Sequence, residues 1–166
     1  MKFHLVDRIE SLEPGKRIVA IKALSLAEEY LADHFPAFPV MPGVLMVEAL
    51  VQTGAWLVRE AQDYAKSIIV LGVARNVRYA SFVQPGQVLR CEVEATEITD
   101  TSAKIRGAGF VGEQQTVSGR FELRCFNLAD RDASLASADE NVVRGLRDRF
   151  RLIHGPEAIQ AIGARP

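Results

Sequence analysis

The sequence predicts an α+β fold in which an antiparallel sheet wraps around one long central helix. The segment 40–58 is almost wholly apolar, and its only polar side chains are Glu48, Gln52 and Thr53. Strand-like alternation stands on both sides of it, and 166 residues with 48% hydrophobic side chains suffice for one domain core. Because an apolar helix is buried on most of its surface, we expect the sheet to enclose it and a second subunit to cover the rest.

Before the helix, the sequence predicts one strand and a proline-rich loop. Residues 17–24 follow a Pro-Gly turn and alternate charged with apolar side chains, which is typical of a strand. A Ser-x-x-Glu capping box opens residues 25–31 and predicts one or two helical turns. Three prolines within 36–42 forbid regular helix and predict a stiff loop. The long helix then begins at Pro42-Gly43 and is expected to run to about Lys66.

After the helix, four segments have strand character and predict an antiparallel meander. They are residues 67–81, 88–98, 102–111 and 115–126, separated by Gly-containing or polar turns. We expect an irregularity near Ala95 and a hairpin between the last two strands. This order, a strand, an apolar helix and a meander, is the hotdog architecture.

We place the hotdog domain at residues 1–126 and a C-terminal extension, expected to be helical, at 127–166. A second capping box within 137–140 introduces a predicted helix over 138–153. One face of that helix carries Arg144, Arg147 and Arg151. Such a face is typical of solvated surface, and the alternative is a surface for an acidic partner.

Composition excludes several classes of function. A net charge of −1 argues against nucleic acid as a principal partner. Cys91 and Cys125 are too few and too far apart for a disulfide framework or a zinc site, so we expect buried free thiols. The first residues lack the apolar run of a signal peptide, and Glu48 and Gln52 interrupt the longest apolar segment well short of a membrane span. These features predict a cytoplasmic protein without membrane insertion.

His34 and Glu48 carry the candidate chemistry. Eliminating water from a 3-hydroxyacyl thioester needs a base near neutrality, an acid for the leaving oxygen, and donors for the developing enolate. His34 suits the base, and a carboxyl desolvated in an apolar helix retains its proton at higher pH and suits the acid. The helix start at Gly43 offers unpaired N–H groups and the positive end of the dipole. Gln52, four residues after Glu48, shares its face and can orient the carboxyl.

Residues 34–52 resemble the signature of FabZ-type β-hydroxyacyl-acyl carrier protein dehydratases, roughly HFPxxPxxPGVLxxEAxxQ. Residues 5–8 and 13–22 resemble the opening of that family, and 84–89 resemble its later Pro-Gly turn. The resemblance therefore covers residues 3 to about 126. It implies a hydro-lyase of fatty-acid or related lipid biosynthesis.

The resemblance also implies the role of each site residue. His34 would remove the C2 proton, Glu48 would protonate the C3 hydroxyl, and backbone N–H groups around Gly43 and Val44 would hold the thioester carbonyl. The related FabA-type isomerase-dehydratases carry aspartate at the acid position, so Glu48 favours dehydration without isomerisation. Further candidates for contact with substrate are Gln52, Phe35, Tyr79 and Phe82.

The same resemblance implies the assembly and the partner. It predicts a homodimer in which His34 of one subunit faces Glu48 of the other, with trimers of dimers as a further assembly. Neither a metal nor an organic cofactor is expected. The acyl group would arrive on the phosphopantetheine of an acidic acyl carrier protein. Candidate residues that receive the carrier at the tunnel mouth are Arg75, Arg78 and Lys104.

Three features depart from the family pattern. Ala37 stands where the family usually has glycine, which would cost about 1 kcal/mol if this residue needs a positive φ. Residues 79–82 (Tyr-Ala-Ser-Phe) replace a more basic stretch, and their two aromatic rings are expected in the core, with a tunnel cap as the alternative. The tail after Asn127 exceeds the usual family length.

Two other functions fit the same fold. A hotdog thioesterase or enoyl-CoA hydratase would also carry a carboxylate on the helix, although the loop histidine is not usual in thioesterases. A non-catalytic acyl-binding subunit would retain the fold alone. The acyl chain length depends on side chains from several segments and does not follow from the sequence.

Overall fold

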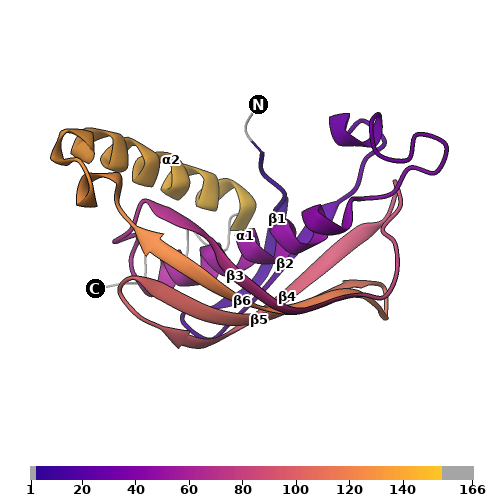
Figure 1. Ribbon diagram of the computed structural model, residues 1–166, viewed down its shortest axis with the longest axis horizontal. Helices are drawn as coiled ribbons and strands as arrows, with labels where there is room; N and C mark the ends of the chain where they lie inside the picture. The colour runs from indigo at the N-terminus through magenta and orange to yellow at the C-terminus, as the bar shows by residue number, and fades with distance from the viewer. Residues whose placement is uncertain (1–2, 155–166) are drawn as a thin grey trace.

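The computed structural model, which describes residues 3–154, contains one six-stranded antiparallel sheet curved around a long helix (Figure 1). The strands are β1 (Arg8–Glu13), β2 (Arg17–Ala23), β3 (Ile68–Tyr79), β4 (Val88–Ile98), β5 (Ser102–Val111) and β6 (Gln114–Phe126). The helices are α1 (Gly43–Ala61) and α2 (Ala136–His154), with short 3-10 turns η1 (Glu29–Leu31), η2 (Leu128–Asp130) and η3 (Ala133–Leu135). This arrangement confirms the predicted α+β hotdog fold.

The strand order is β1-β2-β4-β5-β6-β3, which corrects the predicted meander at one strand. The β4, β5 and β6 strands follow one another as expected, with a register shift after Ala95 in β4 and a hairpin between β5 and β6. The β3 strand, however, pairs with β6 and not with β4. The β4 strand pairs with β2 instead. The β1 strand was not predicted, and it pairs with β2. As a result, β3 is an edge strand of the sheet.

The central helix is five residues shorter than predicted. It ends at Ala61 because Asp63 and Tyr64 adopt left-handed backbone conformations, with φ of 49° and 60°. The Arg147 side chain on α2 donates to the backbone oxygen of Asp63 at 2.9 Å. The expected helical turns at 25–31 are also shorter, and only η1 is helical there.

The α2 helix begins at Ala136, so the predicted capping box at 137–140 is wrong. Asp139 lies inside the helix and is buried, and its carboxylate accepts hydrogen bonds from Ser67 Oγ and from the N–H groups of Leu128 and Ala129, the latter two at 2.9 Å. These bonds join α2 to the start of β3 and to η2. The remainder of the expected extension, residues 155–166, lies outside the described residues.

The predicted solvated arginine face is confirmed at Arg144 and Arg151, which are exposed, whereas Arg147 is partly covered and makes tertiary contacts. Its guanidinium lies 4.3 Å from the centroid of the Tyr64 ring as well as bonding Asp63. The other two arginines form only local contacts, with Asn141 and Asp148 of the same helix. Arg147 therefore attaches α2 to the end of α1, and no acidic partner is needed to explain it.

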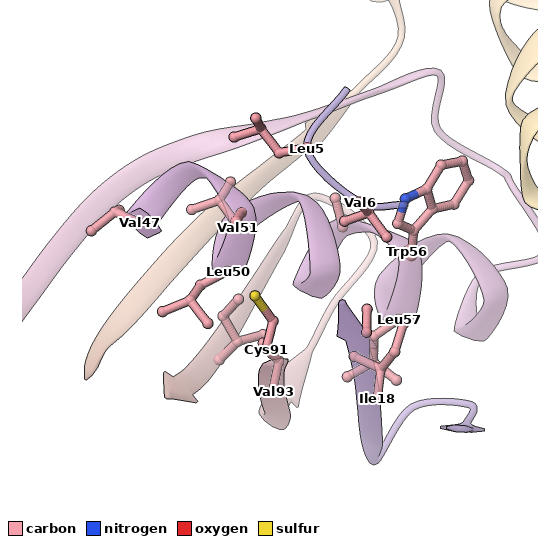
Figure 2. Packing of buried hydrophobic residues seen from close by; sticks show 14 of the residues in the cluster. Leu5, Val6, Ile18, Val47, Leu50, Val51, Trp56, Leu57, Cys91 and Val93 are labelled. Atoms are coloured by element: carbon pink, nitrogen blue, oxygen red, sulfur yellow. The ribbon is translucent and has the colours of Figure 1, made fainter. Parts of the chain in front are cut away.

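The core lies on both sides of α1 (Figure 2). Leu50 and Leu57 point toward the sheet, whereas Leu5 and Val6 of the N-terminal segment cover the opposite side of the helix. Gly54 brings α1 close to the sheet, because a Cβ there would overlap Cδ1 of Ile105 on β5. The helix is thus enclosed between the sheet and residues 3–7.

Cys91 and Cys125 are free and buried, as predicted. None of the helices within residues 3–154 is both long and apolar enough to cross a bilayer. The same residues contain no cluster of three or more His, Cys, Asp or Glu side chains that could hold a metal ion.

Candidate active site

The first turn of α1 presents two N–H groups without a helical acceptor. Pro42 is the N-cap residue, and its carbonyl accepts from Leu45 at 2.9 Å and Met46 at 3.1 Å. The N–H groups of Gly43 and Val44 precede these bonds and have no carbonyl one turn earlier in the helix. They stand at the positive end of the helix dipole and are the two groups that the sequence predicts to hold a developing oxyanion.

Glu48 lies one and a half turns into α1 and is held by Gln52. Gln52 Nε2 donates to Glu48 Oε1 at 2.9 Å and to the Phe3 carbonyl oxygen at 3.2 Å, while Gln52 Oε1 accepts from the Leu5 N–H at 2.9 Å. The N-terminal segment therefore fixes the amide, and the amide fixes the carboxyl. This confirms the predicted Glu48–Gln52 contact.

Glu48 is half-buried in the single chain, where the sequence suggested deep burial. It lines a cavity of about 120 Å³ between α1 and the start of β3. The other lining residues are Val51, Gln52, Ala55, Arg59, Ile69, Val70 and Leu71. The cavity is mostly apolar, with Glu48 and Arg59 as its two charged groups.

The segment that carries His34 is attached to β2 by a buried ion pair. The Lys22 ammonium binds Glu28, the N-cap residue of η1, and lies 3.6 Å from Asp7 Oδ2. Lys22 is only 5% exposed. After η1, the His34 N–H donates to the Tyr30 carbonyl at 3.2 Å. Burial, with Glu28 and Asp7 nearby, raises the pKa of Tyr30, so that phenol stays neutral at physiological pH.

The proline loop after His34 is strained at a different residue than expected. Phe35, and not Ala37, has a positive φ, of 49°. The Phe35 ring meets the His34 imidazole edge-on at a centroid distance of 4.6 Å. Alanine at position 37 therefore carries no left-handed strain.

The single chain does not bring His34 and Glu48 together. His34 is not among the residues lining the cavity beside Glu48, and within residues 3–154 no hydrogen bond joins the two side chains. In Figure 1, η1 and the loop that follows it extend away from the sheet on the side of the molecule where α1 begins. Any joint action of these residues therefore requires a second copy of the chain or movement of the loop.

Several large apolar side chains are exposed around the start of α1. Tyr79 is 53% exposed and Phe82 is 60% exposed, so their predicted place in the core is wrong. The Tyr79 ring lies against Gly43, and the Phe82 ring meets Phe38 edge-on at 5.7 Å. Phe35 and Val44 are exposed as well. These side chains leave an exposed apolar surface beside the helix start.

The candidate basic residues lie on the sheet face opposite α1. Arg75 on β3 is directly opposite Arg120 on β6, which is itself opposite Arg106 on β5. Arg78 lines a surface hollow of about 540 Å³ together with Arg106 and Arg120, and with Glu92 and Glu94, of which Glu94 pairs with Arg106. Lys104 is paired with Glu97 at 2.6 Å. Arg75 and Arg78 thus belong to an arginine-rich patch, whereas Lys104 is neutralised by its neighbour.

Arg59 is the polar residue of this region that the sequence reasoning missed. The helical spacing from Glu48 through Gln52 and Ala55 to Arg59 is the signal in the sequence that places it on the same face.

Comparison with known proteins gives one consistent family. A model for FabA-like domains matches residues 1–119. The curated 3-hydroxyacyl-[acyl-carrier-protein] dehydratase FabZ of Pelotomaculum thermopropionicum is 42% identical over 112 residues, which cover 68% of this chain and 80% of that protein. FabZ of Geobacillus thermodenitrificans is 41% identical over 137 residues, covering 80% of this chain and 89% of that protein.

Solved structures share the fold at low sequence identity. A chain of the dehydratase heterocomplex ApeI:P from Xenorhabdus doucetiae superposes with a TM-score of 0.64 at 16% identity, over 80% of this chain and 90% of that chain. A hypothetical thioesterase from Streptococcus pneumoniae, solved with coenzyme A, gives a TM-score of 0.53 at 12% identity, over 71% of this chain and 86% of that chain.

Proposed function

This chain belongs to the FabA-like domain family, and we propose that it removes water from (3R)-3-hydroxyacyl groups on an acyl carrier protein to give trans-2-enoyl groups. The curated FabZ relatives are 3-hydroxyacyl-[acyl-carrier-protein] dehydratases of closely similar sequence. The observation that carries the proposal is the Glu48 carboxyl, held by Gln52 beside a mostly apolar cavity. The reaction belongs to fatty-acid or related lipid biosynthesis.

In the proposed mechanism His34 is the base and Glu48 is the acid. The imidazole takes the C2 proton, and the N–H groups of Gly43 and Val44 stabilise the enolate oxygen that develops on the thioester. The Glu48 carboxyl gives its proton to the C3 hydroxyl, which leaves as water while the C2–C3 double bond forms. Gln52 holds the carboxyl in position. No metal or organic cofactor takes part in these steps.

The proposed active form is a homodimer in which His34 of one subunit serves Glu48 of the other. Support comes from β3, an edge strand with an unpaired side and exposed Val70, Leu71 and Val73. An apolar edge strand of this kind is suited to pairing with a second copy. The particle mass in solution tests this assembly and distinguishes a dimer from a trimer of dimers.

The proposed carrier protein docks through the arginine-rich patch at Arg75, Arg78 and Arg120. Neighbouring arginines on adjacent strands repel one another, and an acidic surface would relieve that repulsion. We exclude Lys104 from this role because Glu97 already pairs with it. The cytoplasmic location remains a prediction.

An assay on carrier-bound 3-hydroxyacyl substrates tests the proposed reaction. The expected result is new enoyl absorbance that is lost in His34→Ala and Glu48→Gln variants. Full turnover by both variants would refute the mechanism. Release of free acid, or preference for coenzyme A esters, would point to the thioesterase or hydratase alternative, and substrate binding without turnover would point to a non-catalytic subunit.

A further inference from the structure

The N-terminal segment presents one acceptor and one donor to the Gln52 amide. Gln52 Nε2 donates to the Phe3 carbonyl oxygen at 3.2 Å, and Gln52 Oε1 accepts from the Leu5 N–H at 2.9 Å. If the amide were turned over, its oxygen would face the Phe3 carbonyl and its NH2 group would face the Leu5 N–H, and both contacts would be repulsive. The backbone at Phe3 and Leu5 therefore admits only one orientation of this amide.

This orientation determines what the amide offers to Glu48. Gln52 Nε2 also donates to Glu48 Oε1, at 2.9 Å. In a protonated carboxyl the carbonyl oxygen is the better acceptor, so the amide favours Oε1 as the carbonyl oxygen and leaves the proton on Oε2. A turned amide would face Glu48 with its own oxygen, which would accept that proton and compete with the C3 hydroxyl of the substrate. The orientation of Gln52 therefore bears directly on the proton transfer of the proposed mechanism.

The end of α2 contacts both the N-terminal segment and the helix on which this segment lies. Arg149 Nη2 donates to the carbonyl oxygen of Val6, the residue after the one whose N–H binds Gln52. This contact is 3.4 Å long. The next residue of α2, Phe150, is buried, and its ring lies 5.9 Å from that of Trp56 on α1. Figure 2 shows Val6 beside Trp56. The α2 helix thus connects residues 5 and 6 to the helix that carries Glu48.

The Arg149 contact lies outside the part of the chain that the family model matches. The FabA-like model matches residues 1–119, whereas α2 spans Ala136–His154. The matched part contains Glu48, Gln52 and the N-terminal segment. The contact from α2 is therefore an addition to the family domain and not a part of it.

We propose that Arg149 of α2 is a positioning residue for the active site, which holds the N-terminal segment so that the Gln52 amide keeps donating to Glu48. The inference rests on the proposed dehydratase function, in which Glu48 is the acid. Without the Arg149 contact the segment is held less firmly, and turned states of the amide become accessible. The chemical step then slows, because fewer molecules present the Glu48 proton to the substrate, while substrate binding along the apolar cavity is unaffected.

The test measures kcat and KM of Arg149→Met on carrier-bound 3-hydroxyacyl substrates, together with NMR spectra of protein that carries isotope-labelled glutamine. We expect kcat to fall about fivefold and KM to stay within about twofold of the wild-type value. The side-chain NH2 signals of Gln52 should shift or broaden, and the Leu5 N–H should exchange faster with solvent. Arg149→Lys keeps a donor for the Val6 carbonyl and should recover most of kcat and of the Gln52 signals.

Arg151→Met is the matched control, because Arg151 is an exposed arginine of the same helix that pairs with Asp148. It should leave kcat and the Gln52 signals unchanged. A folded Arg149→Met variant with wild-type kcat would overturn this inference and leave the dehydratase function intact. A lower kcat with unchanged Gln52 and Leu5 signals would also overturn it, since Arg149 would then act by another route. Wild-type inactivity on every hydroxyacyl substrate would instead refute the proposed function, and the NMR signals would still decide whether Arg149 holds Gln52.

Discussion

The ring of Tyr79 lies directly against Gly43 at the start of α1. A Cβ on Gly43 would stand 2.9 Å from Cε1 of that ring and 3.2 Å from Cδ1, closer than packed carbon atoms approach. The absence of a side chain at position 43 therefore makes room both for this ring and for a group approaching the first N–H groups of the helix. Because Tyr79 is half exposed, its ring can move when it is pushed.

Gly43→Ala should therefore impair activity much more than stability. The added methyl group displaces the Tyr79 ring and obstructs the approach to the N–H groups of Gly43 and Val44, so we expect kcat/KM to fall about tenfold or more. The free energy of unfolding should change by about 1 kcal/mol or less. The double variant Gly43→Ala/Tyr79→Ala separates the two causes. Recovery of activity to the level of Tyr79→Ala alone would mean that Gly43 only accommodates the ring.

Mixing inactive variants tests whether the site is shared between subunits. If His34 of one subunit serves Glu48 of the other, a dimer of one His34→Ala chain and one Glu48→Gln chain has one intact site. Random reassembly of equal amounts should then restore about a quarter of the wild-type activity. The measurement is the dehydratase rate after joint unfolding and refolding. If both residues come from one chain, every site carries a substitution and no activity returns.

Sequence and structure agree best where hydrophobic pattern decides the element. The apolar run after Gly43 specified a central helix, and the alternation from Val88 to Ile98 specified β4. The hydrophobic pattern does not decide which strands are neighbours in the sheet, because β3 could pack equally well beside β4 or β6. The end of α1 depends on Asp63 and Tyr64 being held by Arg147 and Phe150 of α2, which are more than eighty residues away.

The candidate site was foreseeable in its residues but not in its arrangement. Glu48 and Gln52 are four residues apart on one helix, so their hydrogen bond follows from helical geometry. The position of His34 depends on Lys22, which pairs with Glu28 across the turn after β2 and lies near Asp7, contacts that no helical or strand period indicates. Arg59 attracts no notice in the sequence, because an arginine near a helix end is ordinary. Only the packing of α1 against β3 shows that it shares the cavity of Glu48.

Lys22→Met should displace the segment that carries His34. The substitution leaves Glu28 without its buried cation, so we expect a loss of about 1–3 kcal/mol in unfolding free energy and a fall in kcat of about tenfold. The His34 imidazole signals in NMR spectra should shift, and Lys22→Arg should restore them in part. Lys16→Met, which removes an exposed lysine paired with Glu13, is the control. Unchanged His34 signals and kcat in folded Lys22→Met would limit Lys22 to a role in stability.

Asp139 makes the attachment of α2 dependent on pH. Burial alone would raise the pKa of this carboxyl, but hydrogen bonds from Ser67 Oγ and from the N–H groups of Ala129 and Leu128 outweigh burial and hold it below its ordinary value of 3.8. A carboxyl with a lowered pKa in the folded state stabilises that state at pH values above the ordinary pKa, and this stabilisation is lost as the pH falls through the lowered pKa.

Asp139→Asn should therefore lower the unfolding midpoint at neutral pH, and its difference from the wild type should shrink below about pH 4. Fluorescence of Trp56, the single tryptophan of the chain, reports this transition because its ring lies 5.9 Å from Phe150 of α2. Asp148→Asn, at an exposed position of the same helix, should show no comparable effect. A difference between Asp139→Asn and the wild type that stays constant from pH 7 down to pH 3 would show that the charge of Asp139 does not hold α2 in place.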